Sequence, residues 1–183
     1  SVSISADGSV VAVGSPYNDE NGDNAGLVRI FRDLDGNWTQ VGGDIYGEAE
    51  NDHFGISVSI SADGSVVAYG APNDDENGDN AGLVRTFKDV EGSWIQVEED
   101  TGYFGGSVSR SADGSIISLG AYANDDYGDD AGVVYVFRDA GRGIWKQVGE
   151  EIHGDAAGDR LGETGSVGLS ADGSMIAVGA YSN

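Results

Sequence analysis

Apolar and polar residues alternate along the first five residues of the chain, and this period of two predicts a β-strand. Val2 and Ile4 fall on one face of that strand. Residues 10–13 are apolar at every position, which predicts a return strand buried on both faces. Between them, Asp7-Gly8 is the residue pair that best tolerates the positive φ angles of a two-residue hairpin. We therefore expect the chain to open with a tight β-hairpin.

A second pair of strands is expected downstream of this hairpin. Gly14-Ser15-Pro16 ends the return strand, because proline cannot continue a hydrogen-bonded ladder. After an acidic loop, residues 27–32 alternate again, and a turn leads into a fourth strand that carries Trp38 and Val41. Four short strands joined by tight turns, with no helical period, predict one antiparallel sheet.

The whole pattern recurs along the chain. The phrase SVSISADGS that opens the sequence returns, with variations, at Ser57, Ser107 and Ser166, a period of roughly 55 residues. We therefore divide the chain into three repeats and the first hairpin of a further repeat, at residues 1–56, 57–106, 107–165 and 166–183.

A single sheet with two apolar faces cannot bury itself, so neighbouring repeats must stack. Four strands in each repeat fit a propeller blade better than a solenoid coil. We expect an all-β fold, a β-propeller or an open propeller segment, of four-stranded antiparallel blades. A propeller typically needs about 4 to 8 blades to close. Further blades, or another copy of the chain, are therefore expected to complete the ring.

Composition restricts the partners. The chain has 9 basic and 32 acidic residues, a net charge of −23. This balance argues against nucleic acid, whose phosphates require Lys and Arg, and against anionic membrane surfaces. It suits salty or calcium-containing surroundings, where cations screen the self-repulsion. Cysteine is absent, so disulfides and thiol chemistry are excluded. Neither end shows a leader or capping sequence, and we expect a processed product or a window of a longer protein.

Short glycine motifs recur at fixed places in the repeats. Phe54-Gly55 precedes the second repeat, Gly70-Ala71-Pro72 ends its second strand and Ala81-Gly82 opens its third. We call the first two motifs the FG pair and the GAP triplet. They resemble the FG-GAP repeat of integrin α-subunits and of microbial and algal surface proteins. The equivalent positions are Phe104-Gly105 and Leu161-Gly162 for the FG pair, and Gly14-Ser15-Pro16, Gly120-Ala121-Tyr122 and Gly179-Ala180-Tyr181 for the GAP triplet. The SADGS phrase is also similar to WD40 and TolB-like propellers, but those lack the FG and GAP motifs.

The resemblance to FG-GAP repeats implies a propeller at the cell surface or outside the cell, with a role in adhesion, ligand binding or structural scaffolding. It also implies a calcium loop of the type D-x-[DN]-x-D-G-x-x-D between the first two strands. Here that loop is cut to Ala62-Asp63-Gly64-Ser65, which is too short to wrap a cation. The calcium ligands of the family therefore have no counterparts at this turn.

Another candidate calcium site is the acidic loop after each GAP triplet. Aspartate and asparagine stand there at positions 1, 3 and 5 of a calcium loop. The candidate ligands are Asp19, Asn21, Asp23, Asp75, Asn77, Asp79, Asp125 and Asp129. No glutamate follows at position 12, and Tyr127 replaces the asparagine in the third repeat. The alternative, which we favour, is that these residues shape turns by capping backbone groups with their side chains.

The pattern indicates no catalytic residues. His53 and His153 fall at different positions in their repeats, and no set of serine, histidine and aspartate recurs. Three tryptophans share one position, which predicts packing on the outer strand rather than a sugar-stacking platform: Trp38, Trp94 and Trp145. Arg110 stands where the other repeats have an apolar residue, and we expect it to turn outward or to pair with a carboxylate.

We therefore expect a non-catalytic extracellular or cell-surface module, with calcium as the one candidate cofactor. Its expected partners are a protein or glycan ligand, or further blades or copies of the same repeat, with no nucleic acid and no membrane insertion. Asn37 begins the one glycosylation sequon, Asn37-Trp38-Thr39. The alternative is that the chain supplies non-catalytic blades of a larger secreted hydrolase or lyase, whose catalytic residues lie in other blades.

Overall fold

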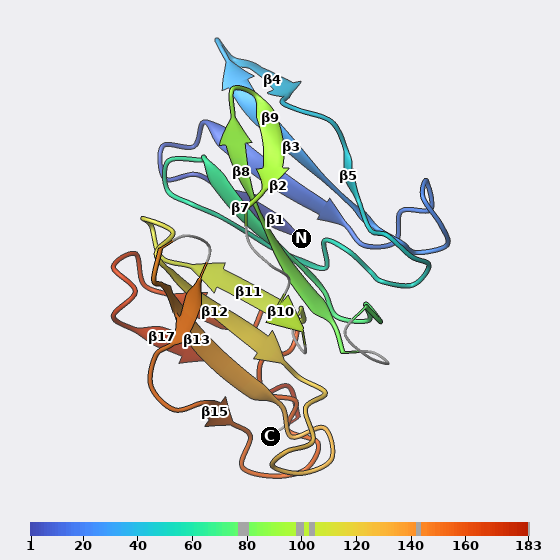
Figure 1. The fold of residues 1–183 in the computed structure, drawn as a ribbon, viewed down its shortest axis with the longest axis vertical. Helices are drawn as coiled ribbons and strands as arrows, with labels where there is room; N and C mark the ends of the chain where they lie inside the picture. The colour runs from blue at the N-terminus through green and yellow to red at the C-terminus, as the bar shows by residue number, and fades with distance from the viewer. Residues whose placement is uncertain (77–80, 98–100, 103–104, 142–143, 183) are drawn as a thin grey trace.

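The computed structural model of the chain describes residues 1–76, 81–97, 101–102, 105–141 and 144–182. These residues form strands and turns. They include no helix of the length and apolarity that a membrane span requires. Figure 1 shows the first two sheets in the upper half of the molecule, and the third sheet with the last hairpin in the lower half.

The first sheet, which we call blade 1, is an antiparallel meander. Its strands are β1 (Val2–Ile4), β2 (Val10–Ser15), β3 (Leu27–Leu34), β4 (Asn37–Gln40) and β5 (Ile45–Tyr46). The order is β1-β2-β3-β4, and β5 pairs with the other half of β3. The expected fourth strand is therefore split into two short segments. Residues 41–44, which contain Gly42-Gly43, interrupt it.

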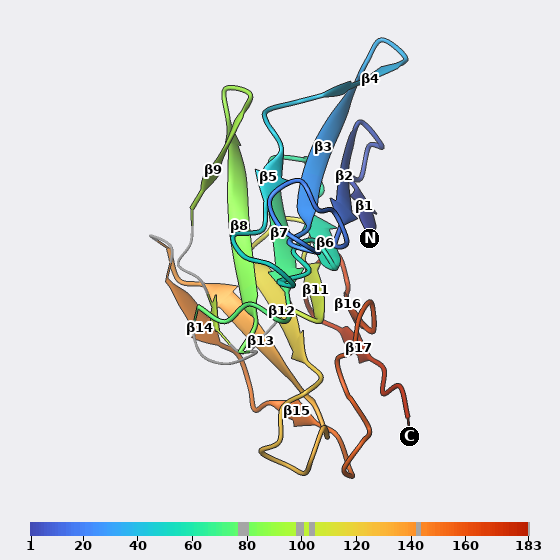
Figure 2. The ribbon, with the colours of Figure 1, turned by 90° about the vertical axis from the view of Figure 1, so that its right-hand side faces the viewer.

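Blades 2 and 3 repeat this topology. Blade 2 consists of β6 (Ser57–Ile60), β7 (Val66–Ala71), β8 (Leu83–Val90), β9 (Ser93–Gln96) and β10 (Thr101–Gly102). Blade 3 consists of β11 (Ser107–Arg110), β12 (Ile116–Ala121), β13 (Val133–Asp139), β14 (Trp145–Gln147) and β15 (Ile152–His153). The terminal hairpin is β16 (Val167–Leu169) paired with β17 (Ile176–Val178). Figure 2 shows β3 and β8 side by side in the upper half of the molecule, with β12 and β13 below them.

The hairpin turn differs from the two-residue turn that the sequence predicts. The amide of Ser5 donates to the carbonyl of Val10, so four residues, 6–9, form the loop. Gly8 has a φ of 75°, which a glycine adopts without strain. The Asp7 carboxylate accepts hydrogen bonds from the hydroxyl of Ser5 and from the amide and hydroxyl of Ser9. The longer turn is preferred because the carboxylate and two hydroxyls satisfy its polar groups.

The hydrophobic core lies between the blades. In each blade, the face that carries Val2 and Ile4, or their equivalents, is called the first face, and the opposite face the second. The main core joins the second face of blade 1 to the first face of blade 2: Val10, Ala12, Val28 and Ile30 with Val58, Ile60, Val67 and Tyr69. A smaller core joins blade 2 to blade 3, through Ala68 and Val84 with Val108, Ile117 and Leu119. The return strands β7 and β12 are buried almost throughout, as predicted, whereas Val11 and Val13 of β2 are only half-buried.

The FG pair and the GAP triplet meet where two blades join. A Cβ atom on Gly14 would lie 2.0 Å from the carbonyl oxygen of Gly55, so the first GAP triplet contacts the FG pair that precedes blade 2. The equivalent contacts join Gly70 to Gly105 and Gly120 to Gly162. Phe54 is buried and packs edge-on against Tyr69, with ring centroids 5.5 Å apart. The glycines allow this close backbone approach, and Phe54 fills the core beside it.

Candidate functional site

The acidic loop after the first GAP triplet is held by its own side chains. The Asp19 carboxylate accepts a hydrogen bond from the amide of Asn24 at 2.8 Å. The side-chain oxygen of Asn18 accepts one from the amide of Glu20 at 3.0 Å. The amide of Gly26 closes the loop by donating to the carbonyl of Asn18. These are the capping bonds by which Asn and Asp stabilise turns.

The same loop is fastened to the connector that leads to the next blade, residues 47–54. The amide of Asn51 donates to the Asp23 carbonyl at 2.8 Å, and that of His53 to the carbonyl of Asn24 at 3.1 Å. The side-chain amide of Asn21 reaches the carbonyl of Gly47 at 2.8 Å. Asn21 therefore bonds to the connector through its side-chain amide, and Asp23 through its backbone carbonyl.

Blade 3 repeats this anchoring. The Asp125 carboxylate accepts from the amide of Asp130 at 2.7 Å, and the carbonyl of Asp129 accepts from Gly158 at 2.8 Å. Backbone bonds from Arg160 and Leu161 to the loop match those made in blade 1. In blade 2, Asp75 is described, whereas the candidate ligands Asn77 and Asp79 lie outside the described residues.

The described acidic side chains do not converge on one centre. Among the described residues, no group of three or more histidine, cysteine, aspartate and glutamate side chains is placed to hold a metal ion. Asp19 and Asp125 instead occupy equivalent positions and make the same backbone bond. Asp19 and Asp125 thus have the turn-forming role, and whether these loops bind calcium stays a prediction.

The tips of these loops differ between blades although their backbones agree. In blade 1, the Tyr46 hydroxyl donates to Glu20 at 2.9 Å, which raises the pKa of Tyr46 to about 12. Arg29 forms a bidentate pair with Asp44, at 2.9 and 2.6 Å, and holds the pKa of that carboxyl well below its usual range. These four side chains form one exposed network beside the loop.

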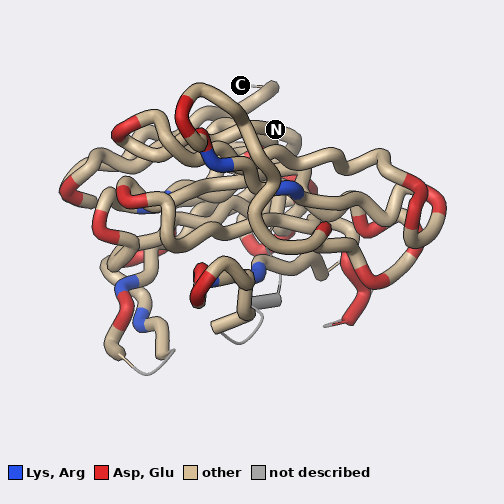
Figure 3. The backbone as a smooth tube through the Cα atoms, turned by 90° about the horizontal axis from the view of Figure 1, so that it is seen from above, with Lys and Arg blue, Asp and Glu red and all other residues tan. Residues whose placement is uncertain are grey.

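Blade 3 has a different network at the same place. The Tyr127 hydroxyl donates to Glu151 at 2.5 Å, which raises the pKa of Tyr127 to about 12 and lowers that of Glu151. The ring of Tyr127 stacks on His153, with centroids 3.9 Å apart. Figure 3 shows acidic positions spread around the loops that border the sheets, with few basic positions among them.

The aspartate of each SADGS turn has a structural role. Asp63 accepts from the hydroxyls of Ser61 and Ser65 and from the amide of Ser65, and these bonds lower its pKa. Asp7, Asp113 and Asp172 make the same set of bonds. The two serines of each SADGS turn are therefore engaged with a neighbouring carboxylate and not with a histidine.

His53 lies in a connector, as the sequence indicates, whereas His153 belongs to the short strand β15. His53 Nδ1 is 2.7 Å from the side-chain amide of Asn73, and its ring meets Tyr17 edge-on. His153 Nδ1 is 2.9 Å from the carbonyl of Gly154. Neither contact places a serine beside the imidazole.

The expectation that Arg110 turns outward is wrong. Arg110 is buried between blades 2 and 3, where its guanidinium donates to Thr86 and to the carbonyl of Gly114. It also lies over the Trp145 ring, 5.4 Å from the centroid. Thr86, in the place of Ile30, supplies a polar partner across the junction, so the two changes compensate each other.

Arg85 is a second buried arginine, and sequence reasoning missed it. It donates to Glu48 of the preceding connector at 2.7 Å and to Glu76 of its own loop at 3.0 Å. The signal was present in the alternation of β8, because Arg85 shares a face with Leu83 and Phe87. An arginine among inward-facing residues indicates a buried ion pair.

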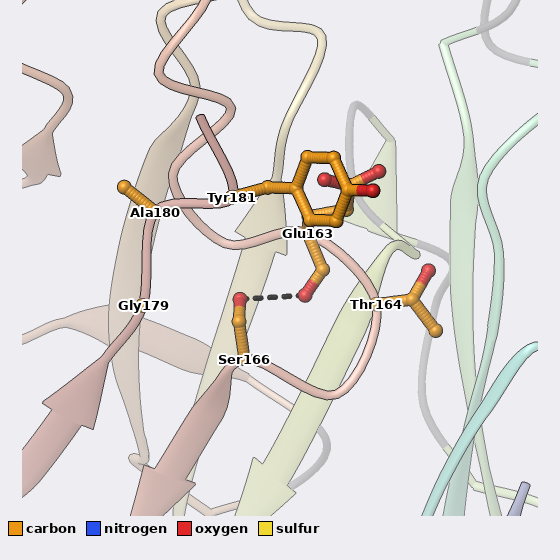
Figure 4. Close-up of a pocket in the computed structure, with 6 residues that line it drawn as sticks. All are labelled: Glu163, Thr164, Ser166, Gly179, Ala180 and Tyr181. Atoms are coloured by element: carbon orange, nitrogen blue, oxygen red, sulfur yellow. Dashed lines mark hydrogen bonds between the residues drawn. The ribbon is translucent and has the colours of Figure 1, made fainter. Parts of the chain in front are cut away.

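A pocket of about 440 Å³ lies at the terminal hairpin (Figure 4). Its lining residues are Glu163, Thr164, Ser166, Gly179, Ala180 and Tyr181. The Ser166 hydroxyl donates to the carbonyl of Glu163 at 2.6 Å. In blade 2 the equivalent residues, Gly70-Ala71, pair with β8. The pocket is therefore the open edge of a two-stranded sheet, and its residues suggest no chemistry.

Asn37, the candidate glycosylation site, is exposed at the start of β4. It follows the Asp35-Gly36 turn, in which both residues have positive φ. Whether it carries a glycan stays a prediction.

Comparisons with known proteins agree with the repeat pattern. A sequence model described as the FG-GAP repeat matches residues 47–87, from the connector before the FG pair to β8. The resemblance to FG-GAP repeats is thus confirmed for that segment. No curated protein matches the chain.

Two solved structures from Bacteroides share the fold, and both are described as a "putative 6-phosphogluconolactonase". The Bacteroides fragilis protein has a TM-score of 0.58 and 18% identity, over 85% of this chain and 39% of its own. The Bacteroides uniformis protein has a TM-score of 0.56 and 14% identity, over 84% and 40%. The chain thus spans about two fifths of their length. At this identity the likeness concerns the fold alone, and it confirms an all-β propeller segment.

Proposed function

We propose that the chain is a non-catalytic propeller module that acts outside the cell or at its surface in adhesion, ligand binding or scaffolding. The observation that supports this most directly is the pair of acidic loops in blades 1 and 3. The backbone hydrogen bonds within each loop, and those from the connector to the loop, are the same in both blades. Their exposed tips differ, with Glu20-Asn21 in one and Asp126-Tyr127 in the other. A rigid rim with variable tips is typical of ligand-binding loops.

The chemistry of the rim suggests a ligand with a basic surface. The chain carries a net charge of −23, and the exposed tips of both loops contribute carboxylates. Complementary charge increases the rate of encounter and the specificity of a complex. A protein ligand with lysine or arginine at its contact surface fits this rim better than a neutral glycan.

Charge-neutral variants of the loop tips provide the test. The double variant Glu20→Gln, Asp126→Asn removes two charges from the rim and leaves the anchoring residues unchanged. A matched control, Asp35→Asn with Glu91→Asn, removes two charges from the β3–β4 and β8–β9 turns, at the other end of those strands. Asparagine tolerates the positive φ of both positions. Binding is measured against immobilised extracellular-matrix proteins and glycans.

We expect the rim variant to lose binding and the control to retain it. Equal loss in both variants would mean that the overall field of the protein, and not the rim, attracts the ligand. Hydrolysis of 6-phosphogluconolactone is measured in parallel. Turnover well above the uncatalysed rate would contradict the non-catalytic assignment and favour the alternative, a part of a hydrolase.

A further inference from the structure

One position of the third strand carries an arginine in blades 1 and 2 and a tyrosine in blade 3. Arg29, Arg85 and Tyr135 each pair with the fourth residue of the preceding strand, which is β2, β7 and β12 respectively. The three residues therefore share one register and one face of their blades. Blade 3 lacks the guanidinium that the other two blades place there.

In blades 1 and 2 this guanidinium binds two carboxylates of the rim. Arg29 forms its bidentate pair with Asp44, and its Nη2 atom is 3.6 Å from Glu20 at the tip of the acidic loop. Arg85 bonds to Glu76, which has the position of Glu20 in its own loop, and to a glutamate of the preceding connector. Each of these blades thus pairs the acidic groups with a cation from its own third strand.

Blade 3 retains the two carboxylates without the cation. Glu151 precedes β15 as Asp44 precedes β5. Asp126 has the loop position of Glu20. The side-chain amide of Gln147 donates to Glu151 at 3.5 Å, as the equivalent glutamine of blade 1 donates to Asp44 at 2.6 Å. In the described part of the chain, no lysine or arginine forms an ion pair with Glu151 or Asp126.

Aromatic side chains lie beside these two carboxylates. The Tyr127 hydroxyl donates to Glu151, and the Tyr127 ring, which is 41% exposed, stacks on His153 with an angle of 9° between the ring planes. Burial, followed by the charges of Glu151 and Asp126, raises the pKa of Tyr135, so that side chain also lies near them. A planar guanidinium suits such surroundings, because it bonds to carboxylates and stacks on aromatic rings.

We propose that blade 3 binds an arginine side chain of a basic protein ligand, in the place that Arg29 and Arg85 fill in the other two blades. We call this place the arginine slot, and its residues are Asp126, Tyr127, Glu151 and His153. The slot specifies one contact of the basic ligand surface, so this proposal rests on the proposed function.

The arginine slot differs from the other acidic positions of the rim in what its equivalents hold. Its counterparts in blades 1 and 2 each contain a guanidinium, whereas the carboxylates of Asp19 and Asp125 accept backbone amides. The slot is exposed, so each contact contributes modestly to affinity. An exposed ion pair and a cation–π contact together should strengthen binding by about three- to thirtyfold over an uncharged side chain. Stacking favours arginine over lysine.

The test is a titration of the 183-residue chain with the tripeptide acetyl-Gly-Arg-Gly-amide at low salt, followed by the NMR shifts of the backbone amides. The citrulline counterpart of this peptide has the same shape without the charge, and the lysine counterpart has the charge without the plane. We expect the arginine peptide to bind more tightly than both, and at least about threefold more tightly than the citrulline peptide. The shifts should concentrate at residues 125–130 and 151–153. Equal binding of the citrulline peptide, or shifts spread evenly over the acidic loops, would overturn the proposal.

Variants of the slot and of its equivalent in blade 1 locate the binding. Glu151→Gln should weaken binding of the arginine peptide by at least about threefold. Asp44→Asn is the matched control, because it removes the same charge where Arg29 already fills the place, and it should leave the affinity unchanged. Tyr135→Arg supplies the guanidinium from β13 itself and should abolish binding. Arg29→Tyr should create a second site in blade 1 and raise the stoichiometry from one peptide to two. Binding that neither Glu151→Gln nor Tyr135→Arg weakens would contradict the slot.

The peptide titration and the matrix-protein assay can fail separately. Binding of the arginine peptide at the slot, without binding of any matrix protein, would support the slot and count against the proposed function. Binding of a matrix protein that Glu151→Gln leaves unchanged, with no binding of the arginine peptide, would overturn the slot and keep the proposed function. Loss of matrix-protein binding in Glu151→Gln, but not in Asp44→Asn, would support both.

Discussion

Replacement of Gly70 by alanine tests the claim that the GAP glycine serves the contact between blades. The Cβ atom of the alanine would lie 2.2 Å from the carbonyl oxygen of Gly105 and 2.4 Å from the hydroxyl oxygen of Ser57. Ser57 itself donates to the Gly105 carbonyl at 3.0 Å, so both obstacles belong to one packed junction. An ordinary contact requires at least about 3.4 Å, so one of the two blades must move by about 1 Å.

The expected cost follows from overpacking. Extra methyl groups in a packed interior typically destabilise a protein by about 1–3 kcal/mol. Because one of the obstacles here is backbone that cannot rotate away, we expect a loss of about 2–3 kcal/mol in the free energy of unfolding. For a chain of this length, that corresponds to a fall in melting temperature of about 4–12 °C. The measurement is urea unfolding together with thermal unfolding, both followed by circular dichroism.

Gly43→Ala is the matched control. A Cβ atom at Gly43 would meet nothing within 4 Å. Its only effect should be to reduce the freedom of the unfolded chain, which stabilises by about 0.4–1 kcal/mol where the backbone is compatible. The two substitutions should thus change stability in opposite directions. A Gly70→Ala variant as stable as the wild type would refute the assignment of this glycine to the blade junction.

Three further predictions concern carboxylates. Asp63→Ala should lower the free energy of unfolding in urea at pH 7 by about 1 kcal/mol, because the turn loses its hydrogen-bond acceptor. Hydrogen bonds from Ser61 and Ser65 lower the folded-state pKa of Asp63 from 3.8, so the difference between the variant and the wild type should shrink as the pH falls below that value. Asp52→Asn should increase the free energy of unfolding at pH 7, because burial and then repulsion from Asp74 raise the pKa of Asp52 in the folded protein. This gain should disappear as the pH falls through that raised pKa, since the carboxyl is then neutral in the wild type. A difference in unfolding free energy that stays constant between pH 7 and pH 3 would contradict this. Calcium added to a chelated sample should leave the melting temperature unchanged, because the carboxylates of Asp19 and Asp125 already accept hydrogen bonds from backbone amides. A calcium-dependent rise in melting temperature that Asp19→Asn abolishes would support the calcium site instead.

The sequence predicts the local structure of each blade well. Strand alternation and turn residues are short-range signals, so the hairpins, the return strands and the third strands appear in the structure where the pattern places them. The split of the fourth strand could not be predicted with the same ease. The interruption contains a glycine of positive φ in blades 1 and 3, Gly42 and Gly149, both at 76°, and Trp94 of the next blade packs against Gly42 alone of the two.

Contacts across the blade junctions are less visible in the sequence, because they join residues about one repeat apart. The burial of Arg110 depends on Thr86 and Trp145, neither of which is its neighbour in the chain. The role of the acidic loops likewise depends on the connector, which supplies the amides of Asn51 and His53. Calcium-like spacing and turn-forming spacing coincide in such loops, so only their hydrogen-bond partners distinguish the two.

Arg85 and Arg29 occupy the same register in successive blades and provide a last test of how a junction works. Arg85 is buried and bonds to Glu48 and Glu76, whereas Arg29, on the uncovered face, pairs with Asp44 while half-exposed. Arg85→Met keeps the apolar stem and removes the charge-assisted bonds, so we expect a loss of about 1–3 kcal/mol in urea unfolding. Arg29→Met should cause a smaller loss, because water can replace the guanidinium at that face. Equal losses in unfolding free energy for Arg85→Met and Arg29→Met would show that packing by a neighbouring blade does not strengthen the ion pairs of Arg85.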